Sequence, residues 1–143
     1  MATYFMDEGA FELTIPGLRD ITTHTLVAEV EGGPVALLVL RSRLPEGIEL
    51  EHAVGRHRRE QSLRFLGFEE LGERERLVGG APALEVRSRY REDTAIVYRR
   101  EAHVLSPRRV WLVLAMRAAF ALQADCDAWM DELLDSFGFR PDD

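Results

Sequence analysis

One apolar run, residues 110–116, constrains the fold more than any other stretch of this sequence. It is far shorter than the roughly 20 apolar residues that a membrane-spanning helix needs. Its β-branched and aromatic residues favour a strand over a buried turn of helix. Because strand side chains alternate, one face receives Val110, Leu112, Leu114 and Met116 and the other receives Trp111, Val113 and Ala115. Both faces of this strand are therefore apolar, and both must be covered.

The composition is that of an acidic globular protein, and we expect residues 1–143 to form one domain. The 18 basic residues are outnumbered by 25 acidic ones, and the net charge of −7 disfavours nucleic acid and anionic lipid as partners. All the basic residues are arginine, so a Schiff-base or P-loop lysine is excluded. With one cysteine, no window of transmembrane length and no signal-peptide pattern, we expect a cytoplasmic protein without stable membrane insertion.

Several further segments alternate apolar and polar residues and end at turns rich in Gly, Pro or acidic residues. With the central run they predict six or seven strands, at residues 11–15, 22–30, 35–43, 69–78, 83–90, 94–105 and 110–116. Most of the connections are short, so the sheet should be antiparallel. The strand at 69–78 is polar and is expected to face solvent.

Two segments have the apolar spacing of a helix. The first covers residues 50–66, with Gly67 in place of a left-handed C-cap, and the second covers residues 126–137, with Asp125 as N-cap and Gly138 at its end. The predicted class is therefore α+β, an antiparallel sheet with two main helices. We expect both helices to cover one face, which leaves the other for a second copy or a client; loops and strand curvature are the alternative.

The residues that commonly carry chemistry do not form a recognisable motif. Cys126 lies between Asp125 and Asp127, whose charges raise the pKa of a thiol, so it should be a poor nucleophile. The basic run at 56–59 is more typical of a solvated helix face than of a nucleic-acid site. No zinc-binding spacing occurs among the four histidines, His24, His52, His57 and His103. We expect a protein that is not an enzyme, uses no cofactor or metal, and does not depend on Cys126 or the histidines.

A series of short motifs resembles the DcrB-related, PsbP-like family, and most closely the EagR chaperones of type VI secretion. The resemblance covers nearly the whole chain, and a C-terminal amphipathic helix closes both. The motifs are Tyr4, Phe11-Glu12-Leu13 before Pro16, Asp20 before a Thr-rich strand, Leu66-Gly67-Phe68, Gly80 and Ala83 in a hairpin, and Tyr98-Arg99 before the final hairpin.

This resemblance implies a cytoplasmic homodimer that binds apolar N-terminal transmembrane segments of an effector before export and shields them from water. The client would lie in a groove on the sheet face. Strand alternation and the family's positions together indicate a groove of Thr25, Val27, Leu37, Val39, Arg41, His57, Tyr98 and Arg100.

Four positions depart from the family's pattern. Leu18 replaces a frequent Trp, and Arg41, His57 and Arg100 replace small or amide side chains. We expect the polar groups of the groove to cap exposed backbone or to pair with Ser, Thr or Gly of the client. The alternative is that the two arginines bind an acidic flank of the client. Two other functions stay open: a PsbP-like accessory or assembly module that binds a folded protein, and, least favoured, an enzyme or small-ligand binder.

Overall fold

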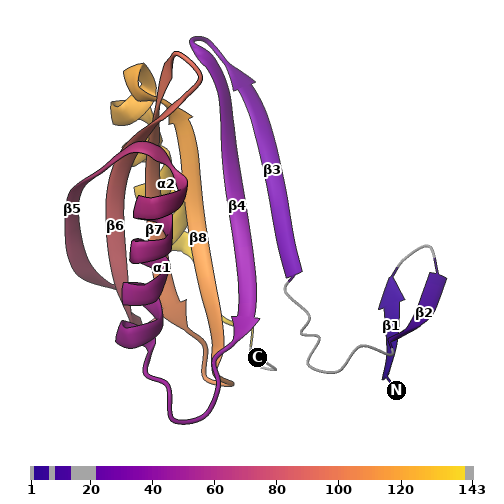
Figure 1. The fold of residues 1–143 in the computed structure, drawn as a ribbon. Coiled ribbons are helices and arrows are strands. Elements are labelled where there is room, and N and C mark those ends of the chain that lie inside the picture. Colours follow the sequence, from indigo (N-terminus) through magenta and orange to yellow (C-terminus); the bar gives the residue numbers. More distant parts are fainter. Residues whose placement is uncertain (1, 7–8, 14–21, 141–143) are drawn as a thin grey trace.

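The computed structural model describes residues 2–6, 9–13 and 22–140 and has an α+β architecture (Figure 1). Its main body is a six-stranded antiparallel sheet with two α-helices, and a separate two-stranded sheet pairs β1 with β2. The elements are β1 (Ala2–Met6), β2 (Gly9–Leu13), β3 (Thr22–Val30), β4 (Gly33–Arg43), α1 (Leu50–Arg64), β5 (Leu66–Val78), β6 (Ala81–Glu92), β7 (Ala95–Leu105), β8 (Val110–Ala119) and α2 (Gln123–Ser136).

The strands of the main sheet lie in the order β3-β4-β8-β7-β6-β5. The hairpin β3–β4 therefore forms one end, the consecutive strands β5 to β8 form the rest, and α1 connects the two parts. The apolar run at 110–116 lies in β8, where Leu114 pairs with Val39 of β4 on one side and Ala102 of β7 on the other. The predicted antiparallel α+β fold, with this run inside the sheet, is confirmed.

The two helices lie on opposite faces of the sheet. Arg100 of β7 binds Asp131 of α2, whereas the next residue, Glu101, lies within hydrogen-bonding distance of His57 of α1. Successive strand residues point to opposite faces, so we name these the α2 face and the α1 face. Figure 1 shows α1 in front of the sheet and α2 behind it. The expectation that both helices cover one face is wrong.

The main hydrophobic core lies between α2 and the sheet. The helix buries Cys126, Met130 and Leu134, whose spacing of four residues keeps them on one side. By contrast, α1 buries only Ala53, Val54 and Gln61. The sheet contributes to the core Val35, Val78, Ala83, Tyr98, Ala102, Val104, Leu112, Leu114, Met116 and Ala118.

The hairpin β3–β4 extends beyond both helices. The helices contact the sheet chiefly at β5, β7 and β8. In β3, Leu26 and Val27 point to opposite faces and are 62% and 63% exposed. The sequence predicted that one whole face of the sheet would be uncovered. The uncovered apolar residues lie instead at one end of the sheet, on both of its faces.

Some local expectations change. No side chain caps α2, which follows a 3-10 turn, and Asp125 lies in its first turn instead. Gly67, with φ of +64°, lies within β5 rather than at the C-cap of α1. The hairpin turn at Gly79 and Gly80 is confirmed by their positive φ angles. The predicted strand at 11–15 is present as β2 up to Leu13, and its last two positions lie outside the described residues.

Candidate functional site

An apolar trough lies on the α2 face, where the hairpin β3–β4 extends past α2. Its first hollow, of about 270 Å³, is lined by Leu26, Val27, Ala28, Val30, Val35, Leu37, Met116 and Trp129. Its second hollow, of about 410 Å³, is lined by Val39, Arg41, Ser106, Arg108, Val110, Leu112, Leu114, Phe137, Gly138, Phe139 and Arg140. We use the word trough for the two hollows together.

The strand register places the two hollows end to end. Leu37 in the first and Val39 in the second are alternate residues of β4, and they pair with Met116 and Leu114 of β8. From Val35 to Arg41, β4 rises about 20 Å at roughly 3.3 Å per residue. That length corresponds to nearly four turns of an α-helix at about 5.4 Å per turn. The trough therefore has the length and the apolar lining to hold nearly four turns of an apolar helix, which is about two thirds of a 20-residue segment.

The segment around and after the end of α2 forms one wall of the trough. Trp129 borders the first hollow and is 37% exposed. Phe137 and Phe139 border the second, and their rings pack edge to face with centroids 5.1 Å apart. A Cβ on Gly79 would lie only 2.9 Å from the Phe139 ring, so this glycine lets the C-terminal segment close against the β5–β6 turn.

Three arginines line the second hollow, at the end of the trough farther from Val35. Arg41 comes from β4, Arg108 from the turn between β7 and β8, and Arg140 from the segment after α2. All three are exposed, and none forms an ion pair with an acidic residue in the described part of the chain. The trough is thus apolar along its floor and cationic at one end.

The trough contains part of the groove that the sequence predicted. Leu37, Val39 and Arg41 line it. Val27 borders the first hollow, but it pairs with Ala36, so its side chain points to the α1 face. Thr25 points the same way as Val27. The expected single open face, with Val27 beside Leu37 and Val39, is therefore corrected by the register.

Tyr98 and Arg100 point to the α2 face, but α2 covers them. Tyr98 is fully buried, and its hydroxyl donates a 2.6 Å hydrogen bond to Asp127. Arg100 is 3% exposed and donates to Asp131 and to both carboxylate oxygens of Glu85. These two expected groove residues instead hold α2 against the sheet.

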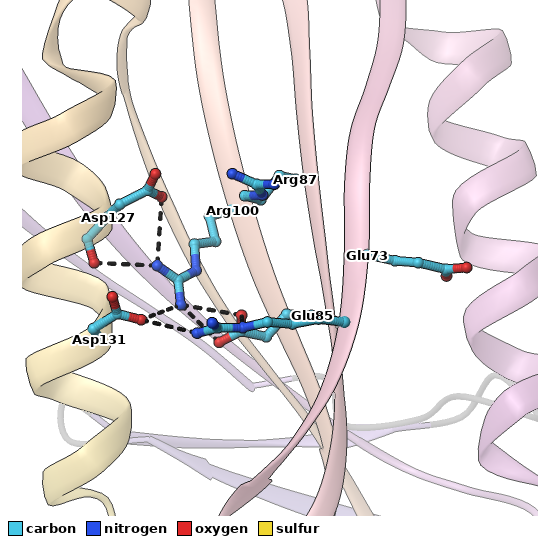
Figure 2. A pocket seen from close by; sticks show the side chains of 7 residues that line it. Glu73, Glu85, Arg87, Arg100, Asp127 and Asp131 are labelled. Atoms are coloured by element: carbon cyan, nitrogen blue, oxygen red, sulfur yellow. Dashed lines mark hydrogen bonds and ion pairs between the residues drawn. The ribbon is translucent and has the colours of Figure 1, made fainter.

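Figure 2 shows how this ionic cluster is built. Arg100 points between Asp127 and Asp131 of α2 and Glu85 of β6, whereas Glu73 points toward the α1 side. Burial alone would lower the pKa of Arg100, but hydrogen bonds and charges from Glu85 and Asp131 raise it overall. Each buried charge here has an opposite partner, which a buried ion pair requires if it is not to destabilise the fold.

The α1 face contains a second buried polar cluster, centred on Glu101. His57 Nε2 and His103 Nε2 lie 3.0 and 2.9 Å from Glu101 Oε2, and Gln61 and Arg99 donate to Oε1. Burial would raise the pKa of Glu101, but the hydrogen bonds from His103 and His57 and the charge of Arg99 lower it well below its usual range. His57, expected in the client groove, therefore belongs to this cluster on the opposite face.

The sequence carried a signal for this cluster. Arg99, Glu101 and His103 are alternate residues of β7, so they share one face of this strand. His57 and Gln61 are four residues apart and lie on one side of α1. What the sequence did not reveal is that these two sets face each other.

Three members of this cluster, His57, Glu101 and His103, place potential ligand atoms within 4.8 Å of one another. The indole N–H of Trp111 donates to Nδ1 of His103 at 3.2 Å, so that nitrogen is an acceptor and Nε2 carries the proton. A metal bound at Nε2 would require the proton on Nδ1, where it would face the Trp111 N–H. The geometry therefore favours a hydrogen-bonded cluster that fixes α1 to the sheet.

Cys126 is fully buried in the core. Burial, and then the neighbouring charge of Asp127, raise the pKa of its thiol to about 12. The thiolate is the reactive form, so this residue is a poor nucleophile. The sequence had indicated the same direction from the acidic neighbours alone, whereas burial is the larger cause.

The fold is an α+β fold similar to that of PsbP, and solved structures that resemble it span nearly the same length. Unknown-function protein PA94 from Pseudomonas aeruginosa superposes with a TM-score of 0.70 at 16% identity, covering 99% of this chain and 98% of that one. LpqN of Mycobacterium tuberculosis, involved in cell envelope biogenesis, gives 0.65 at 17% identity, with coverages of 89% and 87%. Cyanobacterial PsbP (CyanoP) from Synechocystis gives 0.59 at 11% identity, with coverages of 91% and 98%.

The chain belongs to the DcrB family, whose model matches residues 8–136. This match confirms the DcrB part of the sequence resemblance, and the similarity to CyanoP confirms a PsbP-like fold. No curated protein gives a significant match to the sequence. In the described part of the chain, neither helix is long and apolar enough to cross a membrane.

Proposed function

We propose that this protein is a cytoplasmic chaperone or adaptor of the EagR kind. In this role it binds apolar N-terminal transmembrane segments of a type VI secretion effector and shields them from water before export. The observation that carries the proposal is the apolar trough beside α2, together with the resemblance of the sequence to EagR chaperones. The proposal requires no catalytic group, cofactor or metal.

The physical task is to keep an apolar helix out of water. Each 100 Å² of apolar surface buried contributes about 2.5 kcal/mol before the costs of association. Leu26, Leu37 and Trp129 offer such surface without first opening the core, because they are exposed or partly exposed on the wall and floor of the trough. A second copy of the chain would enlarge the shielded surface, and we include a homodimer in the proposal.

A synthetic 20-residue helix of Leu, Ala, Gly and Ser, labelled with a fluorophore, tests the function directly. Leu26→Asp places a charge in the trough at a residue that is 62% exposed, so the fold should survive. The matched control is Leu63→Asp, at a residue of α1 that is 89% exposed. We expect Leu26→Asp to weaken peptide binding at least about tenfold by anisotropy while the melting temperature stays unchanged. Equal binding by the wild type and both variants would refute this use of the trough.

The second candidate function is an accessory or assembly module that binds a folded protein. The observation that favours it is the open edge of β3, which can add a strand from a partner. Under that function the apolar helix should not bind. A folded protein that co-purifies with the wild type should be lost in Thr25→Lys, because this exposed residue lies on the edge strand β3 but outside the trough.

A further inference from the structure

The arginines at one end of the trough make its two ends different in charge. Arg41, Arg108 and Arg140 come from three separate parts of the chain, yet they border the same hollow. Some other arginines of the described residues form ion pairs, such as Arg58 and Arg117, and others such as Arg56 do not, so what distinguishes these three is that they line one hollow together. The three at the trough have no acidic partner among the described residues, so their charge is available to a ligand.

A helix that lies in the trough offers these arginines two kinds of acceptor at its C-terminal end. The last four carbonyl groups of a helix lack partners within the helix. The helix dipole also places partial negative charge at that end. A carboxylate beside it would add a charged acceptor that guanidinium groups bind in a bidentate manner. The N-terminal end of a helix offers unpaired N–H donors and partial positive charge, which arginine would repel.

We propose that Arg41, Arg108 and Arg140 fix the direction and the flanking charge of the bound helix. The helix lies with its C-terminal end at the arginines, and an acidic residue follows its apolar segment. This inference rests on the proposed function, and it adds a rule for which clients the trough selects. It replaces the expectation that Arg41 and Arg100 form the acidic-flank site, because Arg100 is buried beneath α2.

Four synthetic peptides with one identical apolar middle test the proposal. They carry Glu-Glu at the C-terminus, Glu-Glu at the N-terminus, Lys-Lys at the C-terminus, or Gln-Gln at the C-terminus. We expect the peptide with C-terminal Glu to bind about tenfold more tightly than the one with C-terminal Lys at low salt, and the difference to shrink at 0.5 M salt. The peptide with N-terminal Glu should bind no better than the Gln peptide.

The double variant Arg41→Gln with Arg108→Gln should abolish this preference without changing the melting temperature, because both side chains are exposed. Arg56→Gln, at an exposed residue of α1, is the matched control and should keep the preference. If all four peptides bind the wild type equally, the trough binds helices but the charge selection is wrong. If none binds, the proposed function fails and this inference fails with it. If dodecanoate binds in an arginine-dependent manner while the peptides show no preference, the site is for small amphiphiles and the proposal is overturned.

Discussion

Glu101 is a single side chain of β7 that connects helix α1 to the sheet. It is 2% exposed, and it accepts hydrogen bonds from two residues of α1 and two of β7. Since α1 buries few apolar side chains, this carboxylate is a large part of what holds the helix to the sheet. A charge that is buried with four donors stabilises only as long as it stays ionised.

We expect Glu101→Gln to destabilise the protein by about 2–4 kcal/mol, because it leaves Arg99 without its partner and turns one acceptor into a donor. Chemical denaturation followed by circular dichroism measures the loss. Glu60→Gln, at an exposed position of α1, is the control and should change the free energy of unfolding by less than about 0.5 kcal/mol. A Glu101→Gln variant as stable as the control would show that the cluster does not hold α1.

The same cluster predicts how stability depends on pH. Burial lowers the pKa of His103 below its ordinary value of 6.5, and the pKa of Glu101 lies well below 4.5. In both cases the unfolded chain binds the proton more readily. The free energy of unfolding should therefore fall as the pH drops below about 6.5, and fall further below about 4.5.

Denaturation curves at pH 7.5, 5.5 and 4.0 test this pH dependence. His103→Gln should remove most of the decrease between pH 7.5 and 5.5, whereas His52→Gln, at an exposed residue, should retain it. An identical decrease in both variants would assign the effect to other groups. His57 and His103 both contact Glu101, and the expectation that the histidines are dispensable stays a prediction.

At the scale of single elements, the two edge strands of the sheet differ in how well they are protected from pairing with another chain. β5 is irregular in register and carries Glu69, Glu70, Glu73, Arg74, Glu75 and Arg76. Charges and bulges of this kind discourage edge-to-edge pairing. β3 pairs with β4 without a register break, and its exposed residues from 23 to 28 are Thr, His, Thr, Leu, Val and Ala. The edge of β3 is therefore suited to pairing with another strand.

We expect Val27→Lys to reduce self-association, because a lysine on an exposed edge must lose its hydration when a second strand pairs there. Leu63→Lys, on α1, is the control and should leave association unchanged. Sedimentation velocity across a hundredfold range of concentration measures both. Self-association that is unaffected by Val27→Lys would place the contact elsewhere.

The sequence predicted most of the elements because each carries its own period and turn signals. Examples are the hairpin strands, the central strand β8 and the helix α1, whose first residue was predicted correctly. It did not predict which helix covers which face, because that depends on pairing between distant strands. Val39 meets Leu114 only through the β4–β8 ladder, and no local pattern specifies that contact. For the same reason, the sequence predicted only part of the candidate trough.

At the scale of the molecule, the helices cover one end of the sheet and leave the other bare. As the apolar strands indicated, the chain has too little helix to cover the whole sheet. The uncovered apolar surface lies on both faces of β3–β4. A homodimer at micromolar concentration would cover part of this surface. We expect light scattering to give twice the 16.3 kDa mass of the chain, falling toward 16.3 kDa only on strong dilution. A mass of 16.3 kDa at all concentrations would contradict the dimer.

The order of the strands also has a consequence for synthesis on the ribosome. β4 has its inner neighbour in β8, the last strand to be made, so Val35 pairs with Ala118 only after almost the whole chain has emerged. Until then the hairpin β3–β4 has no sheet to join, and an isolated hairpin is marginally stable in water. Closure of such distant pairs is slow compared with local folding. The surface that we propose to shield another protein's apolar segment is therefore itself unshielded during most of its own synthesis.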